Sequence, residues 1–491
     1  MSFVDGTYML QESQTLEFKE AASGLPEDIW ETYSAFANTE GGEIVLGVHE
    51  DTASQTFKLV GVPDPKSLIE DFWKEIRNQK KVSRDILLSD SVTALHRDDL
   101  DFVVIAVPRA SREEKPVETY DKRRKQMVAW VRKGSGDFAA DSQELRLMWY
   151  DSTPKADCMP LDEFGVDSIC SETVTRYRNI FRTLKPKSPW IDDSDADFLY
   201  HIGALAKGRD DQLHPTRAGM LAFGQEYEIT NYIPQYLLDY REETSGLVRW
   251  DDRVVSESDE WSGNLIDFYL MVSLRLRRFF KIPFTTDEHG TSHSAKNPLD
   301  EAVSEALANA LIHSYYGTNA TVLVLLKPDK LTISNPGTLL MSKDVAIAGG
   351  FSETRNPALM RIFNLIGVSD RAGSGLQKIW STWQDEFKQT PSIYEGHHPA
   401  RIELTLPYSG IGQHESSNER SFLLEDDNTG AVYELVRAAG LNGMESIEIA
   451  DSMHLPKRTV QRILKELVSA GLLVKYRSAR TFRYEASDNR S

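Results

Sequence analysis

Hydrophobic residues recur at intervals of three or four positions along several stretches of the chain, which predicts helices with one buried face. The clearest stretch runs from Asn297 to His313, with Asn297 as the expected N-cap and Pro298 as the first helical residue. Its apolar stripe consists of Val303, Ala306, Leu307, Ala310 and Leu311. On the opposite face Glu305, Asn309 and His313 are four residues apart, so their side chains share one side of the helix.

Similar patterns predict helices and strands near both ends of the chain. A helix beginning at Pro26 is followed by a turn rich in Asn and Gly and then by a strand over 43–48. Alternating residues predict a hairpin over 321–334, and a helix is expected after Gly375. At the carboxy end three helices and two strands are expected, over 431–439, 446–453, 455–470, 472–474 and 482–484. The mixture of both kinds of element predicts an α/β (α+β) multidomain protein.

Length, composition and charge agree with a chain of several packed domains. Its 491 residues suggest about three domains of ~150 residues, and 40% hydrophobic residues are enough for packed cores. The net charge of −19 argues against a protein that coats nucleic acid non-specifically. With only Cys158 and Cys170 no disulfide framework is available, which fits a reducing cytoplasm. We see no leader segment and no apolar run near ~20 residues, so we expect a cytoplasmic protein with no membrane partner.

Shifts in composition predict where the domains begin and end. Residues 1–150 are expected to form the first domain. Residues 151–290, with clusters of Pro, Lys and Asp over 151–200, are expected to form a helical connector and the entry to the next domain. Residues 291–408 are expected to form a second domain around the Asn297–His313 helix. Residues 409–430 are polar and rich in Ser, Glu and Asn, as expected of a linker, and residues 431–491 would form the last domain.

The polar face of the Asn297–His313 helix carries candidate chemistry. A carboxylate one turn from a carboxamide suits holding Mg²⁺ and a water beside a phosphate. Farther along, Gly373 and Gly375 let backbone N–H groups approach an anion, and the helix after them adds its dipole. The alternative is a helix with a solvated polar face and two ordinary turns. For His313, packing within the site is favoured over proton chemistry.

The order of these features resembles the GHKL nucleotide-binding fold of gyrase, heat-shock chaperones and histidine kinases, in the divergent form found C-terminal to AlbA-type Schlafen domains. The resemblance implies a sandwich domain that binds ATP and Mg²⁺, in which Glu305 orients the attacking water and Asn309 is the Mg²⁺ ligand. It implies that Asn335 and Gly337 line the adenine side of the site. It also implies that the phosphates are contacted by Gly373, Ser374 and Gly375. Better-known GHKL proteins have Asp where Asn335 stands, so the preference for adenine is left open.

The amino end holds a second group of acidic residues. Glu17 and Lys19 alternate onto one face of an extended segment, and Glu50 lies at the exit of the next strand. The carboxylates of Glu12, Glu17 and Glu50, converging with a lysine, could bind one or two divalent ions, Mg²⁺ or Mn²⁺. Such a site could stabilise the charge on a phosphate while a nucleic-acid strand is cleaved. The alternative is a simple pairing of Glu12 or Glu17 with Lys19 at a sheet edge.

This region resembles the AlbA-type Schlafen domain. The similarity lies in the segments 12–19, 35–48 and 129–135 and covers about residues 10–150. It implies a nucleic-acid-binding domain in which Glu12, Glu17 and Glu50 are catalytic metal ligands beside Lys19, as in the vertebrate Schlafens that cleave RNA. Those enzymes have Asp at the position of Glu50. Binding of nucleic acid without cleavage is the alternative, since many prokaryotic proteins with this domain are described only in that way.

Basic residues gather in two places although the whole chain is acidic. The first is a local strip between 109 and 133 that includes Lys122, Arg123, Arg124 and Lys125, for which a solvated hairpin turn is the alternative. The second is the segment 455–491, with nine Lys or Arg, three acidic residues and a net charge of +6. The carboxy-terminal elements resemble a winged helix-turn-helix domain, for which dimerisation is the alternative to DNA binding. Its candidate DNA contacts are Lys457, Arg458, Arg462 and Arg477.

Three functions fit these patterns. The first is a nucleotide-controlled protein that acts on RNA or DNA, with metal-dependent endonuclease or endoribonuclease activity of the Schlafen type used in defence. The second is an ATP-responsive winged-helix transcriptional regulator without nuclease activity. The third is an ATPase scaffold whose amino-terminal domain recruits partners. GHKL relatives often dimerise, which favours a homo-oligomer.

Overall fold

The computed structural model describes most of the chain. It covers residues 12–51, 56–245, 249–280, 297–317, 321–350, 353–368, 373–397, 399–408, 427–439, 443–453, 455–469, 472–478 and 481–486. The chain divides into two compact units, Met1–Pro407 and Tyr408–Ser491. None of the helices in the described ranges has both the length and the apolar composition needed to cross a membrane.

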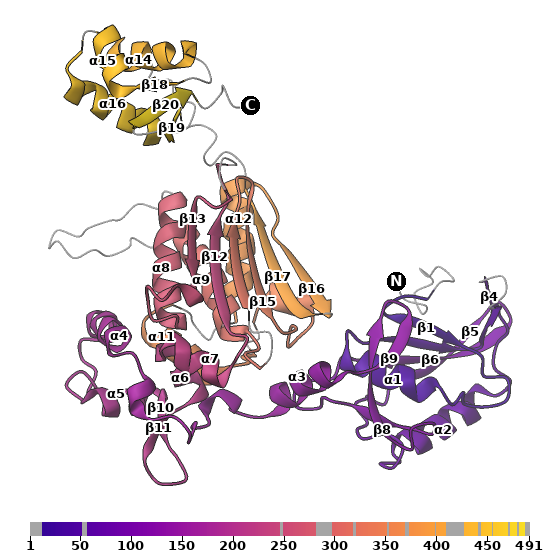
Figure 1. The fold of residues 1–491 in the computed structure, drawn as a ribbon. Coiled ribbons are helices and arrows are strands. Elements are labelled where there is room, and N and C mark those ends of the chain that lie inside the picture. Colours follow the sequence, from indigo (N-terminus) through magenta and orange to yellow (C-terminus); the bar gives the residue numbers. More distant parts are fainter. Residues whose placement is uncertain are drawn as a thin grey trace. The chain divides into compact units, whose positions relative to one another are not determined.

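The amino-terminal part of the first unit is an α+β domain built on a four-stranded sheet (Figure 1). Its elements are β1 (Leu16–Lys19), α1 (Ile29–Asn38), β2 (Gly42–Leu46), β3 (Val48–Asp51), β4 (Thr56–Leu59), α2 (Pro65–Ile76), β5 (Val92–Arg97), β6 (Leu100–Val107), β7 (Glu118–Asp121), β8 (Gln126–Lys133) and β9 (Gly136–Ala139). The sheet has the order β1-β2-β6-β5, with β1 and β2 parallel. On the α1 and α2 side, Tyr33, Phe36 and Phe72 pack against Ile44 and Ile105 in the main core of the domain.

The strand expected over 43–48 is interrupted at Gly47. β2 ends at Leu46, and Gly47 has a φ of +110°, which favours glycine. A Cβ at this position would lie 3.0 Å from Phe102 and 3.1 Å from Gly61. The chain therefore turns at Gly47, and Glu50 lies in the separate β3-β4 hairpin instead of at the end of the central strand.

The next segment of the chain is mainly helical. Its elements are α3 (Ser142–Ser152), two short 3₁₀ helices (Ala156–Cys158 and Val166–Ser168), α4 (Ser171–Leu184), α5 (Asp195–Ile202), β10 (Leu205–Lys207), β11 (Leu213–Pro215), α6 (Arg217–Phe223) and α7 (Glu226–Tyr232). A capping box formed by Asp141 and Glu144 begins α3. Asp157 accepts hydrogen bonds from the backbone N–H groups of Ala358 and Leu359, so this segment is anchored to the helix Pro357–Leu365.

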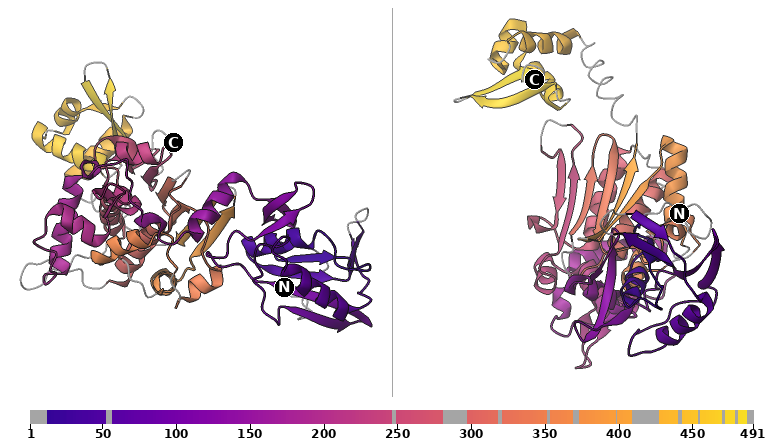
Figure 2. Two further views of the ribbon diagram at one scale, coloured as in Figure 1. Left: turned by 90° about the horizontal axis from the view of Figure 1, so that it is seen from below. Right: turned by 90° about the vertical axis from the view of Figure 1, so that its right-hand side faces the viewer.

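The rest of the first unit is a six-stranded sheet covered by helices (Figures 1 and 2). Its elements are β12 (Leu237–Glu242), β13 (Asp252–Val255), a 3₁₀ helix (Ser256–Ser258), α8 (Leu265–Phe279), α9 (Pro298–His313), β14 (Thr321–Leu326), β15 (Lys330–Pro336), α10 (Lys343–Ala348), α11 (Pro357–Leu365), α12 (Gly375–Phe387), β16 (Ser392–His397) and β17 (Ala400–Pro407). The strand order is β13-β12-β14-β15-β17-β16. Helix α9 packs on β15 and contacts both α8 and α12.

Two strands of this sheet differ from the expected organisation. β12 and β13 come from residues 151–290, which the sequence pattern assigned to a helical connector. β12 pairs with β14 in parallel, and that pairing needs a crossover, which the chain makes through α8 and α9. Composition could not reveal this pairing, because the two partners are separated by both helices.

The second unit contains three helices and a three-stranded sheet of order β18-β20-β19. Its elements are α14 (Asp427–Ala438), β18 (Met444–Glu445), α15 (Ser446–Met453), α16 (Lys457–Ser469), β19 (Leu473–Ser478) and β20 (Thr481–Ala486). The expected helices and strands are all present, and β18 is added to them. Val432, Ile449, Ile463 and Leu473 lie in one buried core, which joins the helices to the sheet.

Candidate functional site

Helix α9 is held at its amino end by its own cap and by two ion pairs. The Asn297 side chain accepts a hydrogen bond from the backbone N–H two residues on, at 2.9 Å. Asp300 lies 2.6 Å from Arg277 of α8, and Glu301 pairs with Lys378 of α12. All five residues of the expected apolar stripe are buried. Helix α9 is therefore fixed against its neighbours, and its polar face has a defined direction.

That polar face lines a cavity, which we call the α9 cavity. Its volume is about 150 Å³, and it is partly open to solvent. Five predicted site residues line it: Glu305, Asn309, Asn335, Gly373 and Gly375. The apolar part of the lining includes Ile333, Met360, Ile393, Ile402 and Leu404. The fold thus brings together one helix face, the end of β15 and the start of α12.

Gly375, the first residue of α12, lies directly against the polar face of α9. A Cβ on Gly375 would be 2.3 Å from Glu305 Oε1 and 3.2 Å from Asn309 Nδ2. Any larger residue would displace these two side chains. Ser374 precedes the helix and lines a neighbouring cavity that also contains Glu305. The Gly-Ser-Gly turn therefore brings the amino end of a helix, with its unpaired N–H groups, to the acid and the amide.

Gly337 stands apart from the other predicted residues. Its φ is +110°, and a Cβ there would lie 2.7 Å from Arg355 Nη1. Arg355 itself lines the α9 cavity. Gly337 therefore makes room for the arginine of the cavity wall, while Asn335, which is 6% exposed, faces the cavity itself.

His313, at the carboxy end of α9, also lines the cavity. Burial lowers the pKa of its imidazole to about 4, and the nearby charge of Arg355 acts in the same direction. The side chain is therefore neutral at pH 7, which agrees with packing within the site.

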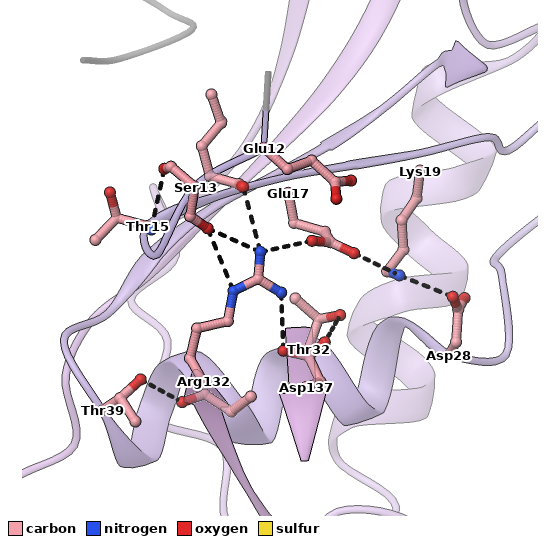
Figure 3. A network of polar contacts seen from close by, with 12 residues as sticks. Glu12, Ser13, Thr15, Glu17, Lys19, Asp28, Thr32, Thr39, Arg132 and Asp137 are labelled. Atoms are coloured by element: carbon pink, nitrogen blue, oxygen red, sulfur yellow. Dashed lines mark hydrogen bonds and ion pairs between the residues drawn. The ribbon is translucent and has the colours of Figure 1, made fainter. Parts of the chain in front are cut away.

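The acidic residues of the amino-terminal domain belong to an ion-pair network (Figure 3). Arg132 Nη2 donates to Glu17 at 2.7 Å, and Arg132 Nη1 donates to Asp137 at 2.9 Å. Lys19 Nζ donates to Glu17 at 3.1 Å and to Asp28 at 2.8 Å. The predicted pairing of Glu17 with Lys19 is present, and Glu17 is 8% exposed between two cations.

Glu12 and Glu50 complete the predicted acidic group. Burial raises the pKa of Glu12 to about 7, and the charges of Glu17 and Glu50 add to this rise. Glu12 also accepts a hydrogen bond from the backbone N–H of Phe18 at 3.2 Å. Across the residues that the structure describes, no three His, Cys, Asp or Glu side chains are placed to hold a metal ion. A metal held by Glu12, Glu17 and Glu50 would therefore need these side chains to rearrange.

The basic strip of this domain forms the exposed turn between β7 and β8. Lys122 pairs with Glu27, and Arg124 lies 3.4 Å from Asp121 and over the Trp130 ring. The Asp121 side chain accepts from the backbone N–H of Arg123 at 2.7 Å. Lys125 has a φ of +55° and closes the turn. The hairpin expected as the alternative is present, and its side chains still face solvent.

In the second unit three basic residues lie on one helix, and another forms partly exposed ion pairs. Lys457, Arg458 and Arg462 lie exposed on α16. Arg483, which contributes to the local charge of +6, pairs with two acids, at 3.5 Å from Glu445 and at 3.1 Å from a glutamate of α15. The side chain of Arg477 lies outside the described residues. The cationic surface is therefore centred on α16.

The sequence did not indicate Arg355 as part of the site. This side chain is 2% exposed and pairs through its Nε and Nη2 with Asp151 at 2.7 and 3.0 Å. It also donates to the carbonyl groups of His313 and Thr338. A single Arg in a polar stretch carries no periodic signal, so only the fold reveals its place in the cavity wall.

Three family models match successive segments of the chain. The model described as "Schlafen, AlbA_2" matches residues 12–141. The chain contains a Schlafen AlbA_2 domain. Residues 146–239 match a domain of unknown function, DUF8451, and residues 319–404 match "Putative ATP-dependent DNA helicase recG C-terminal". The RecG-type match begins after α9, so it does not itself cover Glu305 and Asn309.

Two solved structures are similar to the chain. The DIP2311 protein from Corynebacterium diphtheriae is 14% identical, with 96% of this chain and 95% of that chain covered and a TM-score of 0.39. The N-terminal domain of a "Putative ATP-dependent DNA Helicase RecG-related Protein" from Nitrosomonas europaea is 23% identical, with 27% and 85% covered and a TM-score of 0.21. Scores this low do not establish a common overall fold. No curated protein matches the chain.

Proposed function

We propose that the protein binds a purine nucleoside triphosphate, ATP first among them, with Mg²⁺ in the α9 cavity, and that this binding controls contact of the AlbA_2 domain with nucleic acid. The observation that carries the proposal is the approach of Gly375 to both Glu305 and Asn309 inside one cavity. A helix amino end, an acid and an amide in one place are the groups that a magnesium-bound phosphate requires.

The residues of the cavity fit these roles by their chemistry. The Asn309 carbonyl oxygen would hold Mg²⁺, which supplies charge neutralisation at the phosphates when bound. The Glu305 carboxylate would orient a water and accept its proton. The N–H groups at Gly373, Ser374 and Gly375 would contact the phosphates. The apolar wall and Asn335 would receive the base, and the RecG-type match of residues 319–404 supports this assignment.

Calorimetry on the full chain tests the nucleotide site. We expect Mg·ATP to bind the wild type and Asn309→Ala to raise the Kd at least about tenfold, the equivalent of about 1.4 kcal/mol. Glu386→Gln, an exposed change on α12, is the matched control and should leave the Kd unchanged. Titration with GTP beside ATP shows which base Asn335 prefers. No heat with either triphosphate would remove the proposal.

For nucleic acid, we propose that the exposed turn of residues 122–125 and helix α16 supply the contacts. The second unit has the element order of a winged helix, and α16 would be its recognition helix. Loss of one phosphate contact, as in Arg458→Ala, should weaken duplex binding and reduce its salt slope by about one. An Arg458→Ala variant with unchanged slope would remove α16 from the interface. We also propose a homo-oligomer, which light scattering in solution can test.

Metal-dependent cleavage of nucleic acid is the second candidate function. It is favoured by the electrostatic coupling of Glu12 to Glu17 and Glu50. The capture of Glu17 by Arg132 and Lys19 favours binding without cleavage. Incubation of the purified chain with RNA and DNA in Mn²⁺, with and without ATP, separates the two. Cleavage that Glu12→Gln abolishes would establish the nuclease, and intact substrates would leave binding alone.

A further inference from the structure

Two arginines of the AlbA_2 domain reach the wall of the α9 cavity, and both lie in the loop between β6 and β7. Arg109 Nη2 donates to the carbonyl of Leu339. The Arg109 guanidinium lies 3.7 Å from Glu395, whose carboxylate accepts from the Leu339 N–H at 2.9 Å. Leu339 lines the α9 cavity. Arg109 of the AlbA_2 domain therefore contacts the Leu339 carbonyl directly and the Leu339 N–H by way of Glu395.

Arg112 holds a second segment of the same wall. Its Nη1 donates to the carbonyl of Thr354 at 2.7 Å, and its Nε donates to the carbonyl of Asp151 at 2.9 Å. The residue after Thr354 is the buried Arg355, which pairs with the Asp151 carboxylate and lines the cavity. Arg112 thus contacts the backbone on both sides of the Arg355–Asp151 ion pair.

The same loop is tied to the carboxy end of α1. The Ala110 N–H donates to the carbonyl of Ala37 at 2.8 Å, and the half-buried Lys115 donates to the carbonyl of Asn38 at 2.7 Å. The Asn38 side chain accepts from the Val117 N–H at 2.8 Å. A shift of the loop would therefore act directly on the end of α1.

At its other end α1 carries contacts to the acidic network of Figure 3. Asp28, the residue before the helix, accepts from Lys19 at 2.8 Å, and Thr32 donates to Asp137 at 2.6 Å. Asp137 in turn pairs with Arg132. One helix of 10 residues therefore joins the arginine loop to the network around Glu17.

We propose that Arg109 and Arg112 are positioning residues that couple occupancy of the α9 cavity to the placement of α1 and of the acidic network. The inference rests on the proposed function, since it needs a nucleotide in the cavity. A nucleotide that orders the walls at Leu339 and Thr354 fixes the acceptors of both arginines. It thereby stabilises one arrangement of the loop and of α1. The loop and the helix form a continuous chain of contacts between the two sites, and such a chain can carry coupling.

Hydrogen exchange of the full chain, followed by mass spectrometry, tests this coupling. The probe is Mg²⁺ with a non-hydrolysable ATP analogue, and the reporters are peptides that contain the N–H groups of Leu339, Ala110 and Val117. In the wild type we expect the analogue to slow exchange of all three at least about threefold. In the double variant Arg109→Ala/Arg112→Ala we expect slowing at Leu339 to persist and slowing at Ala110 and Val117 to be lost.

Two further variants make the result specific. Arg109→Lys/Arg112→Lys keeps both charges but lacks the planar forks that contact the wall, so it should lose most of the slowing without unfolding. Arg84→Ala, an exposed arginine of the same domain, should behave as the wild type.

The outcomes separate the two proposals. No binding of the analogue to the wild type overturns the proposed function and this inference with it. Binding with slowing at Leu339 alone in the wild type overturns the inference and leaves the nucleotide site in place. Slowing at all three peptides in both double variants also overturns it, because the two arginines would then carry no coupling.

Discussion

Substitution of Gly375 by Ala should weaken nucleotide binding with little effect on stability. The added Cβ would lie 2.3 Å from Glu305 Oε1, whereas an ordinary contact begins at 3.4 Å, so the carboxylate must move by about 1 Å. The same Cβ would lie 3.2 Å from Asn309 Nδ2, so the side chain proposed to hold Mg²⁺ must also give way. We therefore expect a rise of about tenfold in the Kd for Mg·ATP, comparable to that of Asn309→Ala.

Stability should change much less, because two effects oppose each other. Overpacking costs about 1–3 kcal/mol, and replacement of glycine by alanine in a helix returns roughly 0.5–1 kcal/mol. Calorimetry gives the Kd, and urea unfolding gives the free energy of unfolding. Ser381→Ala, an exposed change on the same helix, is the control. A Gly375→Ala protein that is folded and binds Mg·ATP within twofold of the wild type would refute the reasoning.

Three other changes test separate parts of the structure. Glu305→Gln should keep the Kd for Mg·ATP within about threefold and lower phosphate release at least about 10²-fold, since only the proton acceptor is lost; equal turnover would exclude this role. Arg355→Met should lower the free energy of unfolding, measured by urea denaturation, by about 3–5 kcal/mol, because Asp151 would be left buried without its partner. Adding Asp151→Asn to the same chain should restore part of the loss. The folded-state pKa of Glu12, about 7, exceeds its ordinary value of 4.5. Between these two pH values the folded form retains a proton that the unfolded form has lost. The free energy of unfolding should therefore fall as pH rises from about 4.5 to about 7. Glu12→Gln should flatten this fall in thermal unfolding curves, and an unchanged pH profile would contradict the assigned burial.

The sequence predicted the parts of the site that rest on local rules. The N-cap at Asn297 and the four-residue spacing of Glu305 and Asn309 are properties of a single helix, and the structure has both. Such features could be predicted because each is determined by residues close together in the chain.

Features that depend on distant parts of the chain could not be predicted in this way. Arg355 and Asp151 are about 200 positions apart, and neither has a pattern that indicates the other. Arg132 lies in the segment 129–135 of the Schlafen resemblance, but nothing near it in the chain indicates Glu17 as its partner. The sequence left Glu17 either as a metal ligand or as the partner of Lys19, and the fold gives it two cations.

The parallel pair β12–β14 determines where the polypeptide can be cut. A fragment begun at residue 291 would keep the α9 cavity but lose β12, and the backbone groups of β14 that now bond to it would become an open sheet edge. This strand carries three buried apolar residues, Val322, Val324 and Leu326. The fragment would therefore have an exposed apolar sheet edge that is prone to aggregation. Recombinant pieces of this half should therefore begin before Leu237 if they are to stay monodisperse.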